Sequence, residues 1–192
     1  MNLKIPFRDS FNFNLKYHKL DFLPQKLRGK IIKTLIKLKL IKTYGKITVT
    51  VNRYNGKIEK HTGYNLIPDI GIKHIGDILI GVETTNLTLA YMEADQGTTN
   101  PTIADTDSET PVTPADRLAV TLINRNSVSP FEITTETFIS SAKYSRPVTI
   151  AKLNVFFGPD ETGDLFASGK LDTPVTLNTS DTATLTYAFI WR

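Results

Sequence analysis

The chain has 192 residues, of which 40% are hydrophobic and 22% charged, and its formal net charge is +4 at pH 7. This composition is ordinary for a globular protein and excludes a wholly disordered chain. There is no cysteine, which excludes disulfides, thiolate metal sites and thiol nucleophiles. No apolar run reaches the ~20 residues of a membrane-spanning helix, and the N-terminus lacks the apolar stretch of a signal peptide. We therefore expect a soluble protein.

The positive charge is concentrated in the first third of the chain. Residues 1–60 hold 15 Lys and Arg against 3 Asp and Glu, whereas residues 61–192 hold 8 against 16. The two parts therefore have opposite charge balances, +12 and −8. A basic segment can bind nucleic acid, anionic lipid or an acidic protein face, and the last includes the acidic part of a neighbouring copy. Charge alone leaves these three partners open.

Residues 1–24 combine aromatic side chains with a polar, basic background. The segment is too short to build a core of its own, although each buried Phe contributes ~1.5–3 kcal/mol. It is either a strand packed on its own domain or an arm that anchors in a neighbouring subunit. Aromatic residues dominate interface energetics, so we favour the arm. The candidate anchors are Phe7, Phe11, Phe13, Tyr17 and Phe22.

Residues 25–43 are apolar and rich in lysine. Leu27, Ile31 and Leu35 lie near one helical face, which predicts a helix over about 25–35. The pattern then alternates, which leaves 36–42 open between helix and strand. A basic amphipathic helix can lie on a membrane, but packing against a partner or its own sheet is commoner. The predicted basic contact surface comprises Lys26, Arg28, Lys30, Lys33, Lys37, Lys39 and Lys42.

From residue 46 onward, β-strand patterns dominate. Alternation over 46–54, followed by Asn55-Gly56 and a return strand, predicts a hairpin with a type I′ turn. Residues 67–80 have the pattern of a short helix. Further strands are predicted over 86–92, 117–124, 131–141, 149–157 and 183–191, with another apolar run between the last two. We therefore predict a mainly β protein with one or two short helices. It comprises an antiparallel β-sandwich over residues 46–192 and an extended, basic, aromatic N-terminal arm over residues 1–45, to which the predicted amphipathic helix belongs.

Residues 95–116 form a long polar loop with three prolines. Loops of this length inside a domain are usually functional or disordered. The run Asp105-Thr106-Asp107-Ser108-Glu109, with Asp116 further on, resembles a calcium-binding loop, but Thr110 stands where an EF-hand needs Gly. We interpret the stretch as a solvated acidic loop, with a divalent-ion site as the alternative.

No convergent set of catalytic or metal-binding residues is visible in the sequence. His18, His61 and His74 fall in three different predicted elements, without the paired spacing of a zinc site. There is no Gly-x-Ser-x-Gly elbow and no glycine-rich nucleotide-binding fingerprint. We therefore predict a protein that is not an enzyme and that needs no cofactor or metal.

Several motifs follow the hairpin in a recognisable order. They are Gly63-Tyr64-Asn65-Leu66-Ile67 before Gly71, the loop Gly97-Thr98-Thr99-Asn100-Pro101-Thr102-Ile103-Ala104-Asp105-Thr106, and the stretches 150–157, 163–168 and 181–187. With these motifs, residues 46–192 resemble small structural proteins of tailed bacteriophages that serve as tail-fibre, collar or baseplate components. Lys152, Asn154 and Ser168 depart from the family pattern, which favours Glu, Gly and Arg there. Residues 1–45 have no counterpart.

The resemblance implies a function by assembly in the virion, in the tail, the neck or collar, or the fibre-attachment region, after synthesis in the host cytoplasm. We expect the N-terminal arm to dock on neighbouring subunits, so that the partners are other virion proteins and copies of the chain itself in a homo-oligomeric ring or fibre. Two alternatives stay open. One is a receptor-binding module at a fibre tip that uses the 95–116 loop, and the other is a virion protein whose basic arm contacts nucleic acid.

Overall fold

The computed structural model describes residues 30–31, 33–34, 43–66, 71, 89–102, 104–112, 117–126, 131–140, 147–157 and 164–191. This part of the chain is mostly β-strand, which confirms the predicted mainly β class. Its strands are β1 (Thr43–Asn52), β2 (Ile58–Leu66), β3 (Leu89–Asp95), β4 (Leu118–Ala119), β5 (Leu122–Asn126), β6 (Phe131–Ser140), β7 (Val148–Phe157), β8 (Leu165–Leu177) and β9 (Thr182–Trp191).

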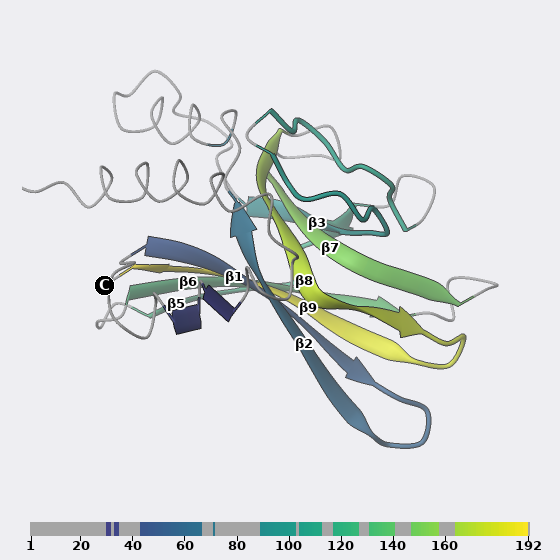
Figure 1. Cartoon of the computed structure of the whole chain (residues 1–192). Coiled ribbons are helices and arrows are strands. Elements are labelled where there is room, and N and C mark those ends of the chain that lie inside the picture. Colours follow the sequence, from purple (N-terminus) through teal and green to yellow (C-terminus); the bar gives the residue numbers. More distant parts are fainter. Residues whose placement is uncertain are drawn as a thin grey trace, which may run out of the picture.

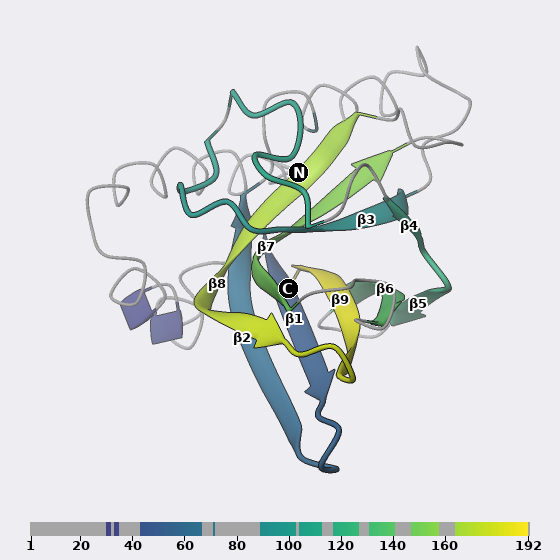
Figure 2. The same cartoon turned by 90° about the vertical axis from the view of Figure 1, so that its right-hand side faces the viewer.

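All nine strands belong to one antiparallel sheet with the order β4-β3-β7-β8-β2-β1-β9-β6-β5. A β-sandwich consists of two separate sheets packed face to face. Here one continuous hydrogen-bonded sheet curls instead (Figures 1 and 2), and the curled sheet encloses the core. The predicted antiparallel β architecture is therefore confirmed, whereas the two-sheet arrangement of a sandwich is not.

The curl is imposed by the short segment that contains β4 and β5. These two strands are at opposite ends of the strand order, yet only Val120 and Thr121 separate them in the chain. The Val120 N–H donates to the Ala90 carbonyl oxygen on β3 at 2.8 Å, whereas the Thr121 N–H donates to the Glu136 carbonyl oxygen on β6, also at 2.8 Å. One extended stretch thus pairs first with β3 and then with β6, which brings the two ends of the sheet together. The single strand predicted over 117–124 is divided at this point.

The core lies inside the curl and follows the two-residue period of the strands. Three directly opposed pairs of β1 and β9 are fully buried, namely Ile47 with Tyr187, Val49 with Leu185 and Val51 with Ala183. The facing strands β3, β7 and β8 contribute the buried Met92, Leu153 and Leu171. The rings of Phe166 on β8 and Tyr187 on β9 meet edge to face at 5.9 Å between centroids. Aromatic and aliphatic packing therefore joins the two sides of the curl.

The hairpin prediction is right in position and wrong in turn type. The Arg53 N–H donates to the Lys57 carbonyl oxygen at 2.8 Å, and the Gly56 N–H donates to the Arg53 carbonyl oxygen at 2.9 Å. The turn is therefore centred on Tyr54 and Asn55, and Gly56 follows it with a φ of 81°. A three-residue loop of this kind needs one left-handed residue after the turn, and glycine adopts that conformation without strain.

Three of the other predicted strands are confirmed, and a fourth ends later than predicted. The strands predicted over 131–141, 149–157 and 183–191 are confirmed by β6, β7 and β9 to within one residue at each end. Strand β3 extends to Asp95, three residues past the predicted end, because its polar residues Glu93 and Asp95 continue the pairing with β7.

The described Lys30, Ile31, Lys33 and Thr34 have helical backbone, in agreement with a helix over 25–35. Apart from Gly71, the helix predicted over 67–80 lies outside the described residues. Within the described chain, no helix combines the length and apolar character needed to cross a membrane.

Leu185→Ala should lower the free energy of unfolding by about 2–5 kcal/mol, because Leu185 has no exposed surface and its truncation leaves a cavity in the core. Leu122→Ala is the matched control, since Leu122 is 44% exposed and should cost less than about 1 kcal/mol. Urea denaturation followed by circular dichroism measures both. Equal losses for the two variants would contradict the assigned core.

Candidate functional site

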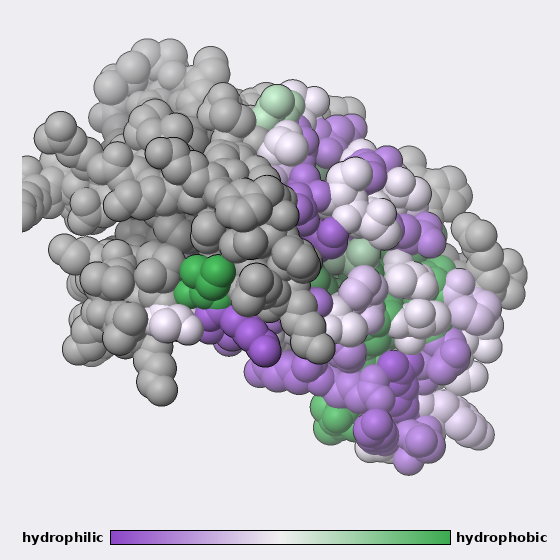
Figure 3. Space-filling model, viewed as in Figure 1, coloured by the Kyte–Doolittle hydropathy of each residue, from purple (hydrophilic) through white to green (hydrophobic). Residues whose placement is uncertain are grey.

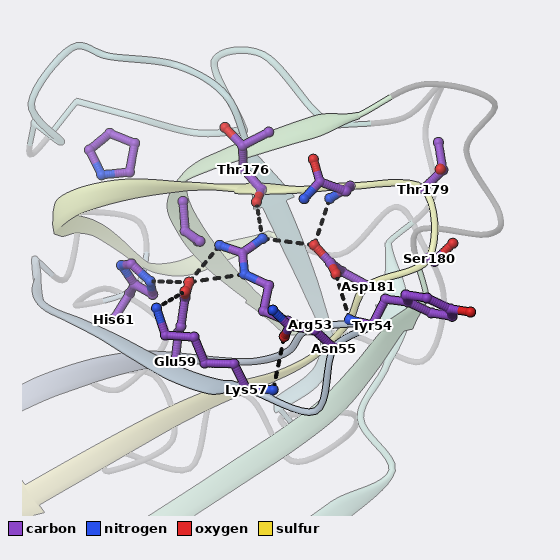
Figure 4. Close-up of a pocket in the computed structure, with 13 residues that line it drawn as sticks. Arg53, Tyr54, Asn55, Lys57, Glu59, His61, Thr176, Thr179, Ser180 and Asp181 are labelled. Carbon is purple, nitrogen blue, oxygen red and sulfur yellow. Dashed lines mark hydrogen bonds and ion pairs between the residues drawn. The ribbon is translucent and has the colours of Figure 1, made fainter.

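The tip of the β1–β2 hairpin and the β8–β9 turn enclose an open pocket of about 720 Å³. The hairpin projects away from the rest of the molecule in Figures 1 and 2. The described residues on the face shown in Figure 3 are mostly hydrophilic, including those near the tip. This pocket is the candidate functional site, and Figure 4 shows its side chains.

The Arg53 guanidinium is the centre of the site (Figure 4). Its Nε and Nη2 both donate to Glu59 Oε2, at 3.0 and 2.5 Å. Its Nη1 donates to Asp181 Oδ2 at 2.7 Å and to the Thr176 carbonyl oxygen at 2.6 Å. Arg53 follows β1 directly, whereas these three partners come from β2, β8 and the β8–β9 turn. One side chain therefore fastens the hairpin tip to the neighbouring turn.

Asp181 holds the turn and the hairpin in a fixed relation. Its side chain is 3% exposed, and its Oδ1 accepts the Tyr54 N–H at 3.0 Å while its Oδ2 accepts the Asn178 N–H at 2.8 Å. Burial raises the pKa of the Asp181 carboxyl, but the hydrogen bonds from Asn178, Arg53 and Tyr54 outweigh it and lower the pKa overall. A buried carboxylate is tolerable here because its oxygens receive donors from three directions.

Glu59 is the second acidic partner of Arg53. Hydrogen bonds from Arg53 and then from Lys57 lower the pKa of Glu59 to about 2. Lys57 Nζ lies 3.0 Å from Glu59 Oε1, and His61 Nε2 lies 3.7 Å from Glu59 Oε2. The cations Arg53 and Lys57 thus balance the anions Glu59 and Asp181, so these four groups add no net charge to the pocket.

Tyr54 is the most exposed apolar group of the site. It is 86% exposed, and it lines the pocket together with Thr179 and Ser180 of the β8–β9 turn. Figure 4 shows Tyr54 extending on the same side of Arg53 as these two hydroxyl side chains. The site therefore offers an aromatic face beside hydroxyl groups, on a rigid base of ion pairs.

A second polar region lies where residues 96–112 cover the outer face of β3, β7 and β8. Asp95 is fully buried and accepts backbone N–H groups of Gly97, Glu109 and Thr110. Lys152 is 3% exposed and donates to Glu109 and, at 3.2 Å, to Thr99. These buried contacts hold the long loop against the sheet.

Further contacts continue this polar layer toward β4. Asn154 donates to Ser108 Oγ at 2.7 Å, and Ser108 donates in turn to Glu93. Arg117 donates to Asp107 at 2.9 Å, and its guanidinium carbon lies 3.6 Å from the centroid of the Phe156 ring. The layer therefore runs from the start of the loop to its end. A cavity of about 360 Å³ remains between the loop and the sheet.

The arrangement of the loop gives no support to the alternative of a divalent-ion site. Asp105 accepts the N–H and the hydroxyl of Thr102, at 2.9 and 2.6 Å, and Asp107 and Glu109 are bound to Arg117 and Lys152. Among the described residues, no three Asp, Glu, His or Cys side chains form a group that could hold a metal ion. Asp116 lies outside the described residues.

The sequence-predicted contact residues are mostly outside the described part of the chain. This holds for all five aromatic anchors (Phe7, Phe11, Phe13, Tyr17 and Phe22) and for Lys26, Arg28, Lys37, Lys39 and Lys42 of the basic surface. Lys30 and Lys33 are described, and Lys33 Nζ lies 2.6 Å from Asp172 Oδ2 on β8. The structure therefore places one predicted basic residue against the acidic part of its own chain.

Sequence reasoning missed both the Arg53 cluster and the buried polar layer. Lys152 and Asn154 were visible as polar residues inside an apolar run, and they are also two of the departures from the phage family pattern. A buried lysine needs a partner, so this signal pointed to an acidic group from elsewhere in the chain. For Arg53 and Asp181, 128 positions apart, no local pattern predicts the contact.

Comparison with known proteins adds no relative. No protein-family model, no curated protein and no solved structure matches the chain. The resemblance to phage structural proteins therefore rests on the motifs in the sequence alone.

Glu59→Gln should lower the melting temperature at pH 7, because the variant loses the ion pair that depresses the pKa of Glu59. A carboxyl group whose pKa is lowered by folding stabilises the fold at pH values above its unfolded pKa of about 4.5. This contribution is lost as the pH falls through the folded pKa of about 2. The difference between variant and wild type should therefore shrink from pH 7 to pH 2. Thermal unfolding at both values tests this, and an unchanged difference would contradict the assigned pairing.

Glu93→Gln should have the opposite effect. Burial raises the pKa of Glu93, although a hydrogen bond from Ser108 and the charge of Arg117 act against the shift. When a carboxyl pKa is raised in the folded state, ionisation destabilises the fold: the penalty grows as the pH rises above the unfolded pKa and is complete above the folded pKa. The variant should therefore melt higher than wild type at pH 8 and equally at pH 4. A lower melting temperature at pH 8 would show that the charge of Glu93 stabilises the polar layer.

Proposed function

We propose that the protein is a non-enzymatic structural component of a tailed-phage virion that acts by assembly. In this proposal the N-terminal arm, residues 1–45, docks on neighbouring subunits. The observation that carries the proposal is a match of charge: within one chain, the basic Lys33 of this arm pairs with the acidic Asp172 of the β-sheet. It is one contact between the two oppositely charged parts of the chain, and neighbouring copies offer the same complementary surfaces.

The described part of the chain has a continuous hydrophobic core. The described core cluster is built from residues between Ile47 and Tyr187, on both sides of the curl. Its buried side chains contact one another across β1, β9, β7 and β8. The described sheet therefore has a hydrophobic core of its own.

Charged residues and aromatic residues would make different contributions to the assembly. Lys33 and Asp172 have 48% and 21% of their side-chain surfaces exposed, and an ion pair of this kind contributes about 0.2–1 kcal/mol. Charge complementarity between copies would thus set partner choice and register more than affinity. The affinity would come from Phe7, Phe11, Phe13, Tyr17 and Phe22.

The double substitution Phe11→Ala/Phe13→Ala should dissociate the assembly formed by the full chain. Two buried aromatic anchors contribute about 3–6 kcal/mol together, which corresponds to at least a hundredfold in affinity. Light scattering measures the mass of the particle, and circular dichroism checks that the sheet is folded. High salt should also weaken the assembly by screening the surface charges.

Phe138→Ala is the matched control, because Phe138 is 52% exposed on the outer face of β6 and lies in the sheet rather than in the arm. It should leave the mass unchanged. If Phe138→Ala dissociates the assembly and the arm substitutions do not, the sheet face is the interface and the arm proposal is wrong. A wild-type chain that is monomeric at all salt concentrations would mean that the arm does not join copies of this chain.

A further inference from the structure

We propose that the pocket at the β1–β2 hairpin tip binds an uncharged saccharide. This inference stands on the pocket alone and does not depend on the assembly proposal. The pocket has an aromatic side chain, hydroxyl and amide side chains in its lining, balanced charges and a rigid base.

The aromatic face is the ring of Tyr54. A single exposed apolar side chain is common on protein surfaces and by itself points to nothing. Tyr54 differs because it lines an open pocket of about 720 Å³ and its backbone is fixed by the N–H bond to Asp181 at 3.0 Å. A pyranose ring has one face rich in C–H bonds, and that face packs on the apolar face of an aromatic ring. The phenol hydroxyl adds a polar group at the edge.

The polar partners come from the β8–β9 turn. Asn178, Thr179 and Ser180 line the same pocket, and within the described part of the chain their side chains make no hydrogen bond. Hydroxyl and amide groups both donate and accept hydrogen bonds, as the hydroxyls of a sugar do. Together with Tyr54 they give the combination of an apolar surface and a few polar groups that orients small ligands.

The charges of the pocket select an uncharged ligand. Arg53 is bound by Glu59 and Asp181, and Lys57 is paired with Glu59 at 3.0 Å. Because the cations and anions neutralise one another, a phosphate or a carboxylate finds no unpaired cation among these four groups. A neutral polyhydroxylated molecule suits the balance of the site better than an anion.

The ion pairs also make the pocket rigid before any ligand arrives. Arg53 joins the hairpin to the Thr176 carbonyl oxygen and to Asp181, and Asp181 in turn fixes the backbone of Tyr54 and Asn178. The backbone that carries Tyr54 and the backbone of the polar turn are therefore held at a set separation (Figure 4). A preformed site loses less conformational entropy on binding than a flexible one.

Saturation-transfer NMR on the full chain tests the proposal with the methyl glycosides of glucose, galactose, mannose and N-acetylglucosamine as probes. At least one probe should receive saturation from the wild-type protein. Tyr54→Ala should weaken that binding by about tenfold or more, whereas Tyr54→Phe, which keeps the ring, should retain it. Ile58→Ala is the matched control, because Ile58 is 69% exposed on the same hairpin and does not line the pocket.

Two results would overturn the proposal. One is the absence of saturation transfer to all four glycosides. The other is binding that survives Tyr54→Ala unchanged, or that Ile58→Ala weakens equally, since either would place the saccharide elsewhere on the protein. Tyr54 is 86% exposed, so its replacement leaves the fold intact and a loss of binding reports on the pocket.

Discussion

The closure of the sheet by residues 118–126 is the constraint on which the rest of the structure depends. Two residues cannot span an open nine-stranded sheet, because an extended residue covers at most ~3.6 Å. With β4 on β3 and β5 on β6, the sheet must therefore curl until these strands meet. The Thr137 hydroxyl, which donates to the Ala119 carbonyl oxygen at 2.7 Å, is a further contact across the junction. The enclosed core follows from this closure.

Charged side chains on the outside of the curled sheet mainly bind neighbouring segments to each other. Arg53 connects the hairpin to the β8–β9 turn, and Lys152 and Asp95 connect the long loop to β3 and β7. Both groups are satisfied by several partners, as buried charges must be. Composition alone would assign the hairpin tip and the long loop to flexible turns. The contacts of these charged groups hold both segments in fixed positions on the surface. The hairpin pocket is one such surface.

The sequence was informative where strand alternation is local and regular. β1, β7 and β9 could be placed because their apolar residues repeat at every second position and face one core. β6 shows the limit of that rule. Its inward residues Thr135 and Thr137 are buried while Phe138 points outward and is 52% exposed, so hydropathy alone does not reveal which face is inside. The buried threonines are accommodated because Thr137 bonds to Ala119 and Thr135 contacts the Met92 sulfur at 3.7 Å.

The number of sheets was beyond sequence reasoning for a physical reason. A curled sheet and a sandwich use the same alternating strands and differ only in which strands form hydrogen bonds with each other. Here the deciding residues are Val120 and Thr121, whose N–H groups bond to opposite ends of the sheet. The Arg53 site likewise depends on the approach of residues 53 and 181 across the fold. Only the turn signal at Asn55-Gly56 was local.

The central claim of the assembly account is that the arm of one copy contacts the acidic part of another. Carbodiimide cross-linking of an equimolar mixture of ¹⁴N- and ¹⁵N-labelled chains tests it directly, because this reagent joins neighbouring lysine and carboxylate side chains. The account predicts peptides of mixed isotope composition that link lysines of residues 1–24 to acidic residues of 61–192. Cross-links from residues 1–24 that join only chains of one isotope would contradict it and would assign this segment to its own sheet.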